Sequence, residues 1–476
     1  MKFETVIGLE IHVELATKTK IFCNCENVFG GEENTHCCPV CLGLPGSLPV
    51  MNQSVVDYAA RVGLALGCEV APVSYMDRKN YHYPDLPKGY QISQRGVPIC
   101  SGGQLNLVDE DGTPFTIGFT EIHMEEDAGK LVHLPKQAAS RADYNRAAVP
   151  LIEIVTDPDF RSASQVCTFL QALRELLISL GVSDCKMQEG SMRCDVNLSL
   201  REEGSTEYGT RCEMKNLNSF RSVTRAIAYE ARRQAELLEK GEKVIQQTLR
   251  WDDDLGKTYA MRDKEDSQDY RYFPEPDLPP IVISAEHMQE LKDSLPELPQ
   301  ARSQRYEALG LASQEARLLA NTAWMTTLMD GALAQKADAK IAANWLIGPM
   351  ASLWNEHAAQ EEPLPFTGEQ YGAFVQLITG NKINSSGAKT VLETMVETGK
   401  DPDTIVKEKN LAQMEDTDAL LQVAKEVVAE NQDTVEAYLG GREKAFASLI
   451  GAAMKKTRGK ANPKVIRQLI LDLIQK

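Results

Sequence analysis

The chain has 476 residues, of which 43% are hydrophobic and 25% charged, and its formal net charge is −17. This length predicts about two to four domains, and the lack of an apolar run of roughly 18 residues argues against a membrane protein. The 11 cysteines are odd in number and scattered, which argues against a disulfide framework and predicts a reducing, cytoplasmic location.

The first predicted element is a strand over residues 5–15 whose two faces differ. Its apolar residues fall on one face, and Glu10, His12 and Glu14 fall on the other. A carboxylate, an imidazole and a second carboxylate on one face can form half of a Mg²⁺ site. A solvated strand face has the same pattern, so this strand alone leaves both interpretations open.

Two pairs of cysteines follow this strand, Cys23 with Cys25 and Cys38 with Cys41. Four thiols in two close pairs predict a tetrahedral Zn²⁺ site, and Cys37 could replace Cys38 as a ligand. Free thiols in a loop are the alternative. Because four cysteines would close the coordination sphere, the predicted zinc is structural rather than catalytic.

A tyrosine-rich and lysine-rich segment lies between residues 79 and 91. Its aromatic rings could stack on a base or ribose while its amines neutralise phosphate, although a rigid surface loop explains the pattern equally well. The residues are Lys79, Tyr81, Tyr83, Lys88 and Tyr90.

Further carboxylates lie in apolar stretches that predict strands. An unpaired carboxylate is costly in such surroundings, and a shared divalent cation is one way to stabilise several of them. One stretch, residues 194–200, alternates and is followed by a return strand at 209–215, which predicts a hairpin. The carboxylates are Glu125, Glu126, Asp127, Glu153, Asp195 and Glu213.

Two helices are predicted in the first half, at residues 160–180 and 219–240, and each ends at a glycine. With the strands they predict an α+β fold, in which residues 1–294 form a catalytic domain around a mixed, largely antiparallel sheet. Helical patterns replace strands beyond about residue 300. We divide this part into a helical domain, 295–405, and a small helical tail domain, 406–476.

Residues 255–258, Leu-Gly-Lys-Thr, resemble the end of a phosphate-binding P-loop. Trp251, however, occupies the position of the first required glycine. The sequence also has no nucleophile elbow and no serine-rich amidase loop. We therefore do not expect the chain to hydrolyse glutamine, and any ATP must be held in another way.

Charge is unevenly distributed near the C-terminus. Residues 401–440 contain ten acidic residues and three lysines, whereas residues 441–476 contain nine Lys or Arg and two acidic residues. Several of these cations lie between residues 455 and 460, including Arg458. A basic segment on an acidic protein predicts nucleic-acid binding, with a solubilising end as the alternative.

Many phrases of the sequence are similar, in order and nearly from end to end, to those of the B subunits of aspartyl/glutamyl-tRNA amidotransferases. One departure is His82, where the family more often has an aromatic residue. Some members of the family lack the four cysteines, in keeping with a structural role for zinc. The similar phrases are residues 6–15, the four-cysteine loop, 83–91, 125–130, 143–147, 188–195, 215–220, 269–276 and 454–463.

The resemblance implies an ATP-dependent amidation. The γ-phosphate of ATP passes to the side-chain carboxylate of mischarged Glu-tRNA(Gln) or Asp-tRNA(Asn), and ammonia displaces phosphate from the resulting acyl phosphate. The ammonia comes from an amidase (glutaminase) A subunit, and a small C subunit completes a heterotrimer. Whether Glu-tRNA, Asp-tRNA or both are the substrates stays open.

The resemblance also implies roles for particular residues. Catalysis is expected at Glu10, His12, Glu125, Lys79 and Lys88. Nucleotide binding is expected at Tyr81, Tyr83, Asp85, Tyr90, Arg146 and Lys215. Mg²⁺ is expected at Glu10, His12, Glu125, Glu153, Asp195 and Glu213, where convergence requires the strands that carry His12 and Glu125 to be neighbours.

The main alternative is a non-catalytic adaptor that binds mischarged tRNA and presents it to an amidase partner. It explains the basic tail and the cysteine loop but not the acids on strand faces. A self-contained zinc hydrolase is disfavoured because four cysteines leave the metal no open position.

Overall fold

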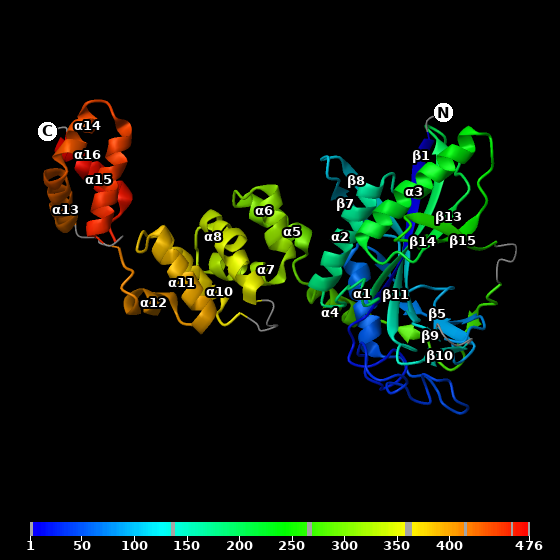
Figure 1. The fold of residues 1–476 in the computed structure, drawn as a ribbon. Helices are drawn as coiled ribbons and strands as arrows, with labels where there is room; N and C mark the ends of the chain where they lie inside the picture. Colours follow the sequence, from blue (N-terminus) through cyan, green and yellow to red (C-terminus); the bar gives the residue numbers. More distant parts are fainter. Residues whose placement is uncertain are drawn as a thin grey trace. The chain divides into compact units, whose positions relative to one another are not determined.

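The computed structural model describes residues 3–134, 139–263, 269–357, 364–413, 417–457 and 460–474. The chain forms two compact units, Met1–Leu298 and Pro299–Lys476, and each is described by itself. The first unit contains the strands and the second is helical, which agrees with the expected α+β class (Figure 1).

A ten-stranded sheet organises the first unit. Its order is β15-β14-β13-β12-β1-β11-β8-β6-β2, and β7 pairs with β8. β13 and β14 are parallel, whereas the other pairs of this sheet in the described part of the chain are antiparallel. The prediction of a mixed, largely antiparallel sheet is confirmed. The strands are β1(Phe3–Glu14), β2(Glu69–Val70), β6(Cys100–Ser101), β7(Gln104–Val108), β8(Pro114–Glu126), β11(Pro150–Thr156), β12(Met192–Glu202), β13(Cys212–Lys215), β14(Gln247–Asp252) and β15(Lys257–Asp263).

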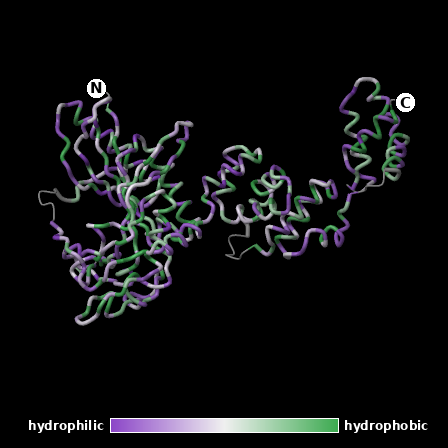
Figure 2. Tube along the Cα trace, turned by 180° about the vertical axis from the view of Figure 1, so that it is seen from behind, coloured by the Kyte–Doolittle hydropathy of each residue, from purple (hydrophilic) through white to green (hydrophobic). Residues whose placement is uncertain are grey.

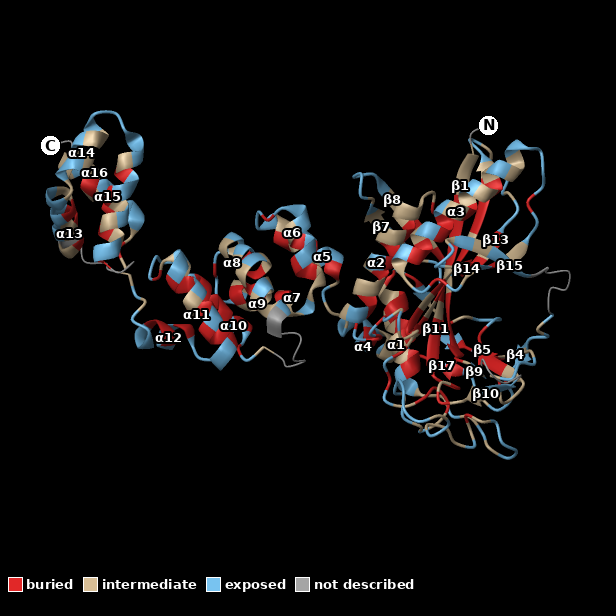
Figure 3. Cartoon of the chain, viewed as in Figure 1, coloured by how far each residue is buried: buried red, intermediate tan, exposed pale blue. Residues whose placement is uncertain are grey.

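β1 lies near the centre of this sheet and confirms the predicted alternation. Ile7, Leu9 and Ile11 are buried in a core that also contains residues of α1(Gln53–Ala65), α2(Ala163–Ser179) and α3(Phe220–Glu239). Each such aliphatic side chain contributes ~1.5–3 kcal/mol of burial free energy, so a charge there would break the packing. Figure 2 shows hydrophobic residues along these strands, and Figure 3 shows the same strands buried. Helices therefore cover the apolar face, and the polar side chains of β1 lie on the opposite face.

The two helices predicted in this unit form, with slightly shorter limits than expected. Ser162 and Ser219 cap them because each side chain accepts a hydrogen bond from a backbone amide three residues on. Each helix stops just before a glycine with positive φ, at Gly181 and Gly241. The prediction began α2 at Phe160, but the Ser162 cap delays its start to Ala163.

Small sheets and a terminal helix complete the unit. The three-stranded sheet β16-β4-β5 brings the tyrosine-rich segment beside residues from the end of the unit. Residues 255–258 lie at a turn between antiparallel β14 and β15, not between a strand and a helix, so they do not form a P-loop. The remaining elements are β3(Val73–Ser74), β4(Asp77–Asn80), β5(Tyr90–Ser93), β9(Lys130–Leu134), β10(Ala139–Asp143), β16(Phe273–Pro274), β17(Ile281–Val282) and α4(Ala285–Asp293).

The second unit is helical throughout its described residues. It contains two hydrophobic clusters, one between Tyr306 and Val406 and one between Leu420 and Ile470. The expected boundaries at 295–405 and 406–476 stay a prediction, although these clusters agree with two cores. The elements are α5(Pro299–Ala308), α6(Ser313–Asn321), α7(Ala323–Ala334), α8(Ala339–Trp345), the π-helix η1(Leu346–Met350), α9(Ala351–His357), α10(Gly368–Thr379), α11(Ser385–Thr398), α12(Pro402–Glu408), α13(Thr417–Glu430), α14(Gln432–Leu439), α15(Glu443–Lys456) and α16(Pro463–Ile474).

Candidate active site on the polar face of the sheet

Sheet register gathers acidic and imidazole side chains on the polar face. His12 of β1 is paired with Glu153 of β11, and Glu153 is paired with His123 of β8. Paired residues on adjacent strands point to the same side, so these three side chains form one row, with Glu125 two residues beyond His123. The strands that carry His12 and Glu125 are not neighbours, because β11 lies between them, yet the two side chains converge. β11 contributes the bridging carboxylate.

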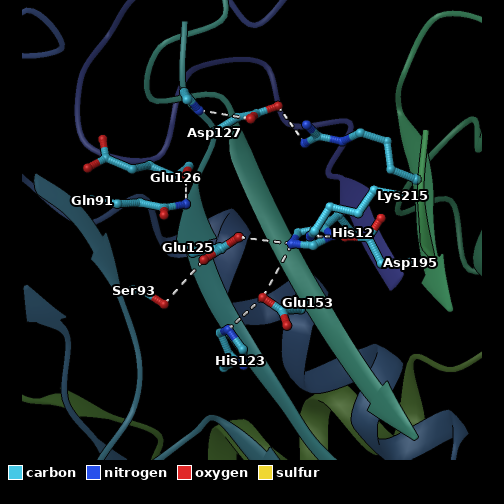
Figure 4. Close-up of polar contacts among 12 residues, drawn as sticks. His12, Gln91, Ser93, His123, Glu125, Glu126, Asp127, Glu153, Asp195 and Lys215 are labelled. Carbon is cyan, nitrogen blue, oxygen red and sulfur yellow. Dashed lines mark hydrogen bonds and ion pairs between the residues drawn. The ribbon is translucent and has the colours of Figure 1, made fainter. Parts of the chain in front are cut away.

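The first acidic cluster consists of His12, Glu125 and Glu153, whose potential ligand atoms lie within 4.8 Å of one another. His12 Nε2 lies 3.5 Å from Glu125 Oε1 and 3.3 Å from Glu153 Oε2. His123 Nε2 lies 3.3 Å from the same Glu153 oxygen (Figure 4). The Ser93 hydroxyl donates to Glu125 Oε2 at 3.3 Å, and the Glu125 side chain is only 2% exposed.

The pKa shifts in this cluster indicate that its carboxylates favour positive charge nearby. Burial lowers the pKa of His12, but Glu153 and Glu125 outweigh burial and the net pKa is raised. In the same way burial lowers the pKa of His123 while Glu121 and Glu153 raise it, to about 10. Burial would raise the pKa of Glu153, yet His12 and His123 bring it below its usual value. The carboxylates thus favour the protonated form of both imidazoles, and a divalent cation could supply that positive charge instead.

The second acidic cluster lies in the adjacent rows and consists of Glu10, Asp195 and Glu213. Lys215 Nζ lies 2.6 Å from Asp195 Oδ2 and 3.0 Å from Glu213 Oε1. The Asn197 amide donates to Glu10 at 2.9 Å. Burial raises the pKa of Glu10, and Glu153 and Glu213 raise it further, so the two clusters influence each other. Lys215, predicted to bind nucleotide, is thus placed among these acids.

Each acidic cluster offers three protein ligands. Mg²⁺ prefers oxygen and usually keeps water or phosphate oxygens in its shell, so three carboxylates suit it directly. The first cluster adds an imidazole, which suits Mg²⁺ less well and a transition metal better. Both clusters fit divalent cations that remain open to a phosphorylated ligand.

Lys79 and Tyr81 are both close enough to the first cluster for the Glu125 carboxylate to raise their pKa values. Burial lowers the pKa of Lys79, but Glu125, Tyr272 and Glu153 raise it overall. The Tyr81 hydroxyl donates to Gln91 Oε1 at 3.2 Å.

Three other predicted residues of this segment are placed differently. Lys88 pairs with Glu126, which follows Glu125 in β8 and therefore points to the other face. Tyr90 stacks on the Arg78 guanidinium, with Arg78 Cζ 4.3 Å from its ring centroid. Tyr83 is 53% exposed. The structure does not bring Lys88 or Tyr90 into either acidic cluster.

A third group of charges closes one end of the polar face. Arg193, the other partner of His12, lies 2.6 Å from Asp127 Oδ2. The Glu14 carboxyl is hydrogen-bonded to Asp127, and burial together with Asp127 raises the pKa of Glu14 to about 8. Arg146 donates to the carbonyl oxygens of residues 128 and 129, at 3.0 and 2.8 Å. Asp85 reaches this turn through its own carbonyl, which accepts from the amide of residue 129 at 2.8 Å.

The four cysteine sulfur atoms also converge, within 4.8 Å of one another. Cys38 is a member of the group, and its Sγ lies 3.9 Å from that of Cys41. Cys37 instead donates to the Asn34 carbonyl at 3.3 Å. Hydrogen bonding from Cys23 contributes most to lowering the pKa of Cys41, to about 5. This geometry favours Cys38 over Cys37 as the fourth ligand and suits a tetrahedral metal.

Buried Lys20 joins the cysteine loop to the sheet. Its Nζ donates to the His36 carbonyl at 2.8 Å and to the Ala147 carbonyl at 2.7 Å. The next residue donates its amide to the Ala148 carbonyl at 3.1 Å. The cysteine loop is therefore fixed to the turn that carries Arg146.

Sequence reasoning did not single out His123 or Arg193. His123 lies two residues before Glu125, so strand alternation could have placed it on the same face. Arg193 could not have been found in this way, because its position depends on the register between β1 and β12. The contact of the Tyr270 ring with that of Tyr81, at 5.8 Å between centroids, was also missed, since Tyr270 comes from a distant segment.

Comparison with known proteins identifies the family. Residues 5–289 match the model of the GatB/GatE catalytic domain, and residues 327–474 match that of the GatB domain. The chain is 48% identical over 480 residues to the B subunit of the aspartyl/glutamyl-tRNA(Asn/Gln) amidotransferase of Caldicellulosiruptor saccharolyticus, with 100% of both chains covered. The chain belongs to the family of these amidotransferase B subunits. The Anaeromyxobacter dehalogenans member is 50% identical over 474 residues, with 98% of each chain covered, and the Clostridium tetani member is 47% identical over 477 residues, with 100% of each covered.

Family membership confirms the resemblance that the sequence phrases indicated. It applies to both units, because one matched region lies in the first and the other in the second. Within the described part of the chain, no helix is both long and apolar enough to cross a membrane.

Proposed function

We propose that this chain activates the side-chain carboxylate of mischarged Glu-tRNA(Gln), Asp-tRNA(Asn) or both. The γ-phosphate of ATP is transferred to the carboxylate, and ammonia then displaces phosphate from the acyl phosphate to give the amide. The observation that carries this proposal is the pair of adjacent acidic clusters on one sheet face. Phosphoryl transfer depends on positioning and charge neutralisation more than on a protein nucleophile.

In this proposal the two clusters are the Mg²⁺ sites. His12, Glu125 and Glu153 hold one ion, and Glu10, Asp195 and Glu213 hold the other. When bound, the ions neutralise phosphate charge and polarise the phosphoryl oxygens. Strand register is the main feature that keeps these carboxylates aligned. In addition, Ser93 orients Glu125 and Asn197 orients Glu10, each by a hydrogen bond.

Fixed cations complete the proposed site. In this proposal Lys79 neutralises the transferred group, and the rise that Glu125 and Glu153 cause in its pKa, against the effect of burial, supports this role. Lys215 contacts the second cluster directly, at 2.6 Å from Asp195. Lys88 and Arg146 support the site indirectly, through residues next to it. Lys88 pairs with Glu126, and Arg146 lies 3.5 Å from Asp127.

The cysteine group is proposed to hold a structural Zn²⁺. Four thiolates leave no open position, so the metal stabilises the loop rather than reacting. All 11 cysteines are free, and a thiolate site of this kind needs a reducing compartment, which supports a cytoplasmic location.

Partner subunits are proposed to supply the amidase activity for which this sequence has no motif. Because it carries no amidase motif, we propose that an amidase A subunit produces the ammonia and that a small C subunit completes the complex. We also propose that the tail binds tRNA through exposed Arg442, Lys444, Lys455, Lys464 and Arg467. Lys456 instead pairs with Glu426 and Glu430, and Arg458 lies outside the described residues.

A labelled-phosphate assay on the assembled complex tests the proposal. ATP with Glu-tRNA(Gln) but no glutamine should yield ADP as the acyl phosphate forms, and labelled phosphate as water then hydrolyses that acyl phosphate in place of ammonia. Uncharged tRNA(Gln) is the matched control and should release little. If phosphate release required glutamine but not the mischarged amino acid, the carboxylate would not be the phosphoryl acceptor, and a non-catalytic tRNA adaptor would be favoured.

A further inference from the structure

His123 of β8 is buried beside the first acidic cluster without being a member of it. Its side chain is 9% exposed, and its two ring nitrogens lie near two different carboxylates. Nε2 is 3.3 Å from Glu153 Oε2, and Nδ1 is 3.2 Å from Glu121 Oε1. The ligand atoms that lie within 4.8 Å of one another belong to His12, Glu125 and Glu153. The metal site proposed above therefore gives this histidine no role.

Strand geometry fixes the position of the ring. Glu121 and His123 are two residues apart in β8, so both side chains point to the polar face of the sheet. β11 is the adjacent strand, and its register places Glu153 opposite His123. Figure 4 shows the His123 ring directed at the Glu153 carboxylate. Glu121, His123 and Glu153 therefore form a line of side chains that ends at a member of the first cluster.

Glu121 supports the far side of the His123 ring. Nδ1 is buried and forms no well-aligned hydrogen bond within the described residues, so the Glu121 carboxylate at 3.2 Å is its polar contact. An ionised carboxylate only accepts hydrogen bonds, so a ring between two carboxylates is most favourable with a hydrogen on each nitrogen. The contact with Glu121 thus favours the ring orientation in which Nε2 is a donor toward Glu153.

The Glu153 carboxylate depends on imidazoles for its orientation. Its polar contacts in the described part of the chain are with His12 and His123, each at 3.3 Å. A histidine that binds a metal does so through the lone pair of a ring nitrogen, and that nitrogen cannot donate a hydrogen bond at the same time. With His12 Nε2 as a metal ligand, His123 is the donor that remains for Glu153.

We propose that His123 is a positioning residue, which orients the Glu153 carboxylate toward the metal while Glu121 holds the His123 ring in place. This rests on the proposed function, because it takes the first acidic cluster as a metal site. Outer-shell partners fix the orientation of metal ligands, and their loss weakens metal binding about 10- to 100-fold. Ser93 provides the corresponding hydrogen bond for Glu125.

The test measures Mn²⁺ binding to the assembled complex by electron paramagnetic resonance, without ATP or tRNA. Mn²⁺ is the probe because carboxylates suit it as they suit Mg²⁺, and because it is paramagnetic. His123→Leu should weaken the Mn²⁺ affinity of one site about 10- to 100-fold. His123→Gln keeps an amide donor near the position of Nε2 and should recover most of this loss. Glu121→Gln should cause a smaller loss, because the ring keeps its contact with Glu153.

His133→Leu is the matched control. His133 is exposed, its Nδ1 lies 2.8 Å from the Ser140 hydroxyl, and it belongs to neither acidic cluster, so Mn²⁺ affinity should not change. Thermal melting without metal separates a positioning role from a role in folding, because only the latter lowers the melting temperature. If His123→Leu does not fold, His123→Asn replaces it, since the shorter amide reaches the position of Nδ1 but not that of Nε2.

Each outcome decides the proposal. Unchanged Mn²⁺ affinity in His123→Leu, with affinity lost in Glu153→Gln, would overturn the positioning role and leave the proposed metal site in place. Equal losses in His123→Gln and His123→Leu would overturn it in favour of direct metal binding by His123. Normal Mn²⁺ binding by Glu153→Gln would instead remove the first cluster from the proposed function, whatever the His123 variants did. The failure of the positioning role is thus distinct from the failure of the proposed function.

Discussion

The two kinds of candidate metal-ligand group in the first unit are built in opposite ways. The cysteine group comes from one loop, with its four ligands between Cys23 and Cys41. The acidic clusters draw their ligands from five strands, β1, β8, β11, β12 and β13, between Glu10 and Glu213. The first group is closed by four protein ligands, whereas each acidic cluster offers three and remains open.

This difference separates stabilisation from chemistry. A closed thiolate site contributes metal-binding energy to folding and leaves the metal no position for a substrate. The acidic clusters bury carboxylates that repel one another, which lowers stability until cations neutralise them. Such internal conflict is expected where a protein gives up stability for function.

The largest effect on activity is expected from a substitution of Glu125 in the first acidic cluster. Glu125→Gln keeps the side-chain size and removes the charge, so the protein should fold. Phosphate release with Glu-tRNA(Gln) should fall about 100-fold or more, because transition-state charge loses a metal ligand. The partner's basal glutaminase activity should be kept. Melting of the variant and the wild type without divalent cations checks that the variant is folded.

Glu110→Gln is the matched control, because Glu110 is exposed and lies before β8. It should leave phosphate release unchanged. Near-normal amidation by both Glu10→Gln and Glu125→Gln would mean that the active site lies elsewhere.

The next largest effect is expected from substitutions in the cysteine group. Replacing Cys25 and Cys41 by serine should remove about one zinc per chain and expose the loop to proteolysis, because soft ligands are lost. Amidation should fall much less than in Glu125→Gln. Metal analysis and limited proteolysis check this, and Cys37→Ser should retain the zinc. A double variant that kept its full zinc content would contradict the assignment.

The tail provides a smaller effect, on substrate affinity alone. Deleting residues 441–476 would remove most of the core that covers Leu420, Ala424 and Val427, so charge replacement is the cleaner test. Changing Lys444, Lys455, Lys464 and Arg467 to glutamine should raise the KM for Glu-tRNA(Gln) about tenfold and flatten its salt dependence. ATP binding should not change. An unaltered salt slope would leave the tail as a solubilising end.

Local patterns in the sequence predicted much of this structure. The alternation in β1, the two capped helices and the paired cysteines each depend on residues close together in the chain. The acidic clusters depend on register instead. The sequence indicated that Glu153 and Glu125 were candidates, but not that β11 lies between the strands of His12 and Glu125. The contact between the Tyr81 and Tyr270 rings was beyond local reasoning, because it depends on the pairing of β4 with β16.

The smallest effect on amidation is expected at Lys20. A substitution there tests whether a nearby cation balances the negative charge of the cysteine group, as lysines do in the acidic clusters. Lys79 and Lys215 serve the acidic clusters, and Lys20 is the counterpart beside the cysteines. Lys20 is fully buried, yet both of its hydrogen-bond partners are neutral carbonyls. A buried ammonium group is costly without a countercharge, and zinc bound by four thiolates would carry net negative charge.

Lys20→Met keeps the length of the side chain and removes its charge. Loss of such an outer-shell partner should weaken zinc retention about 10- to 100-fold in competition with a chelator, while phosphate release stays close to normal. Lys18→Met is the matched control because Lys18 is exposed on the same segment. Equal zinc retention by the two variants would show that Lys20 is held by its carbonyl partners alone. The negative charge of the cysteine group would then be balanced from its solvent-facing side. The acidic clusters differ in this respect, because their cations lie among the carboxylates.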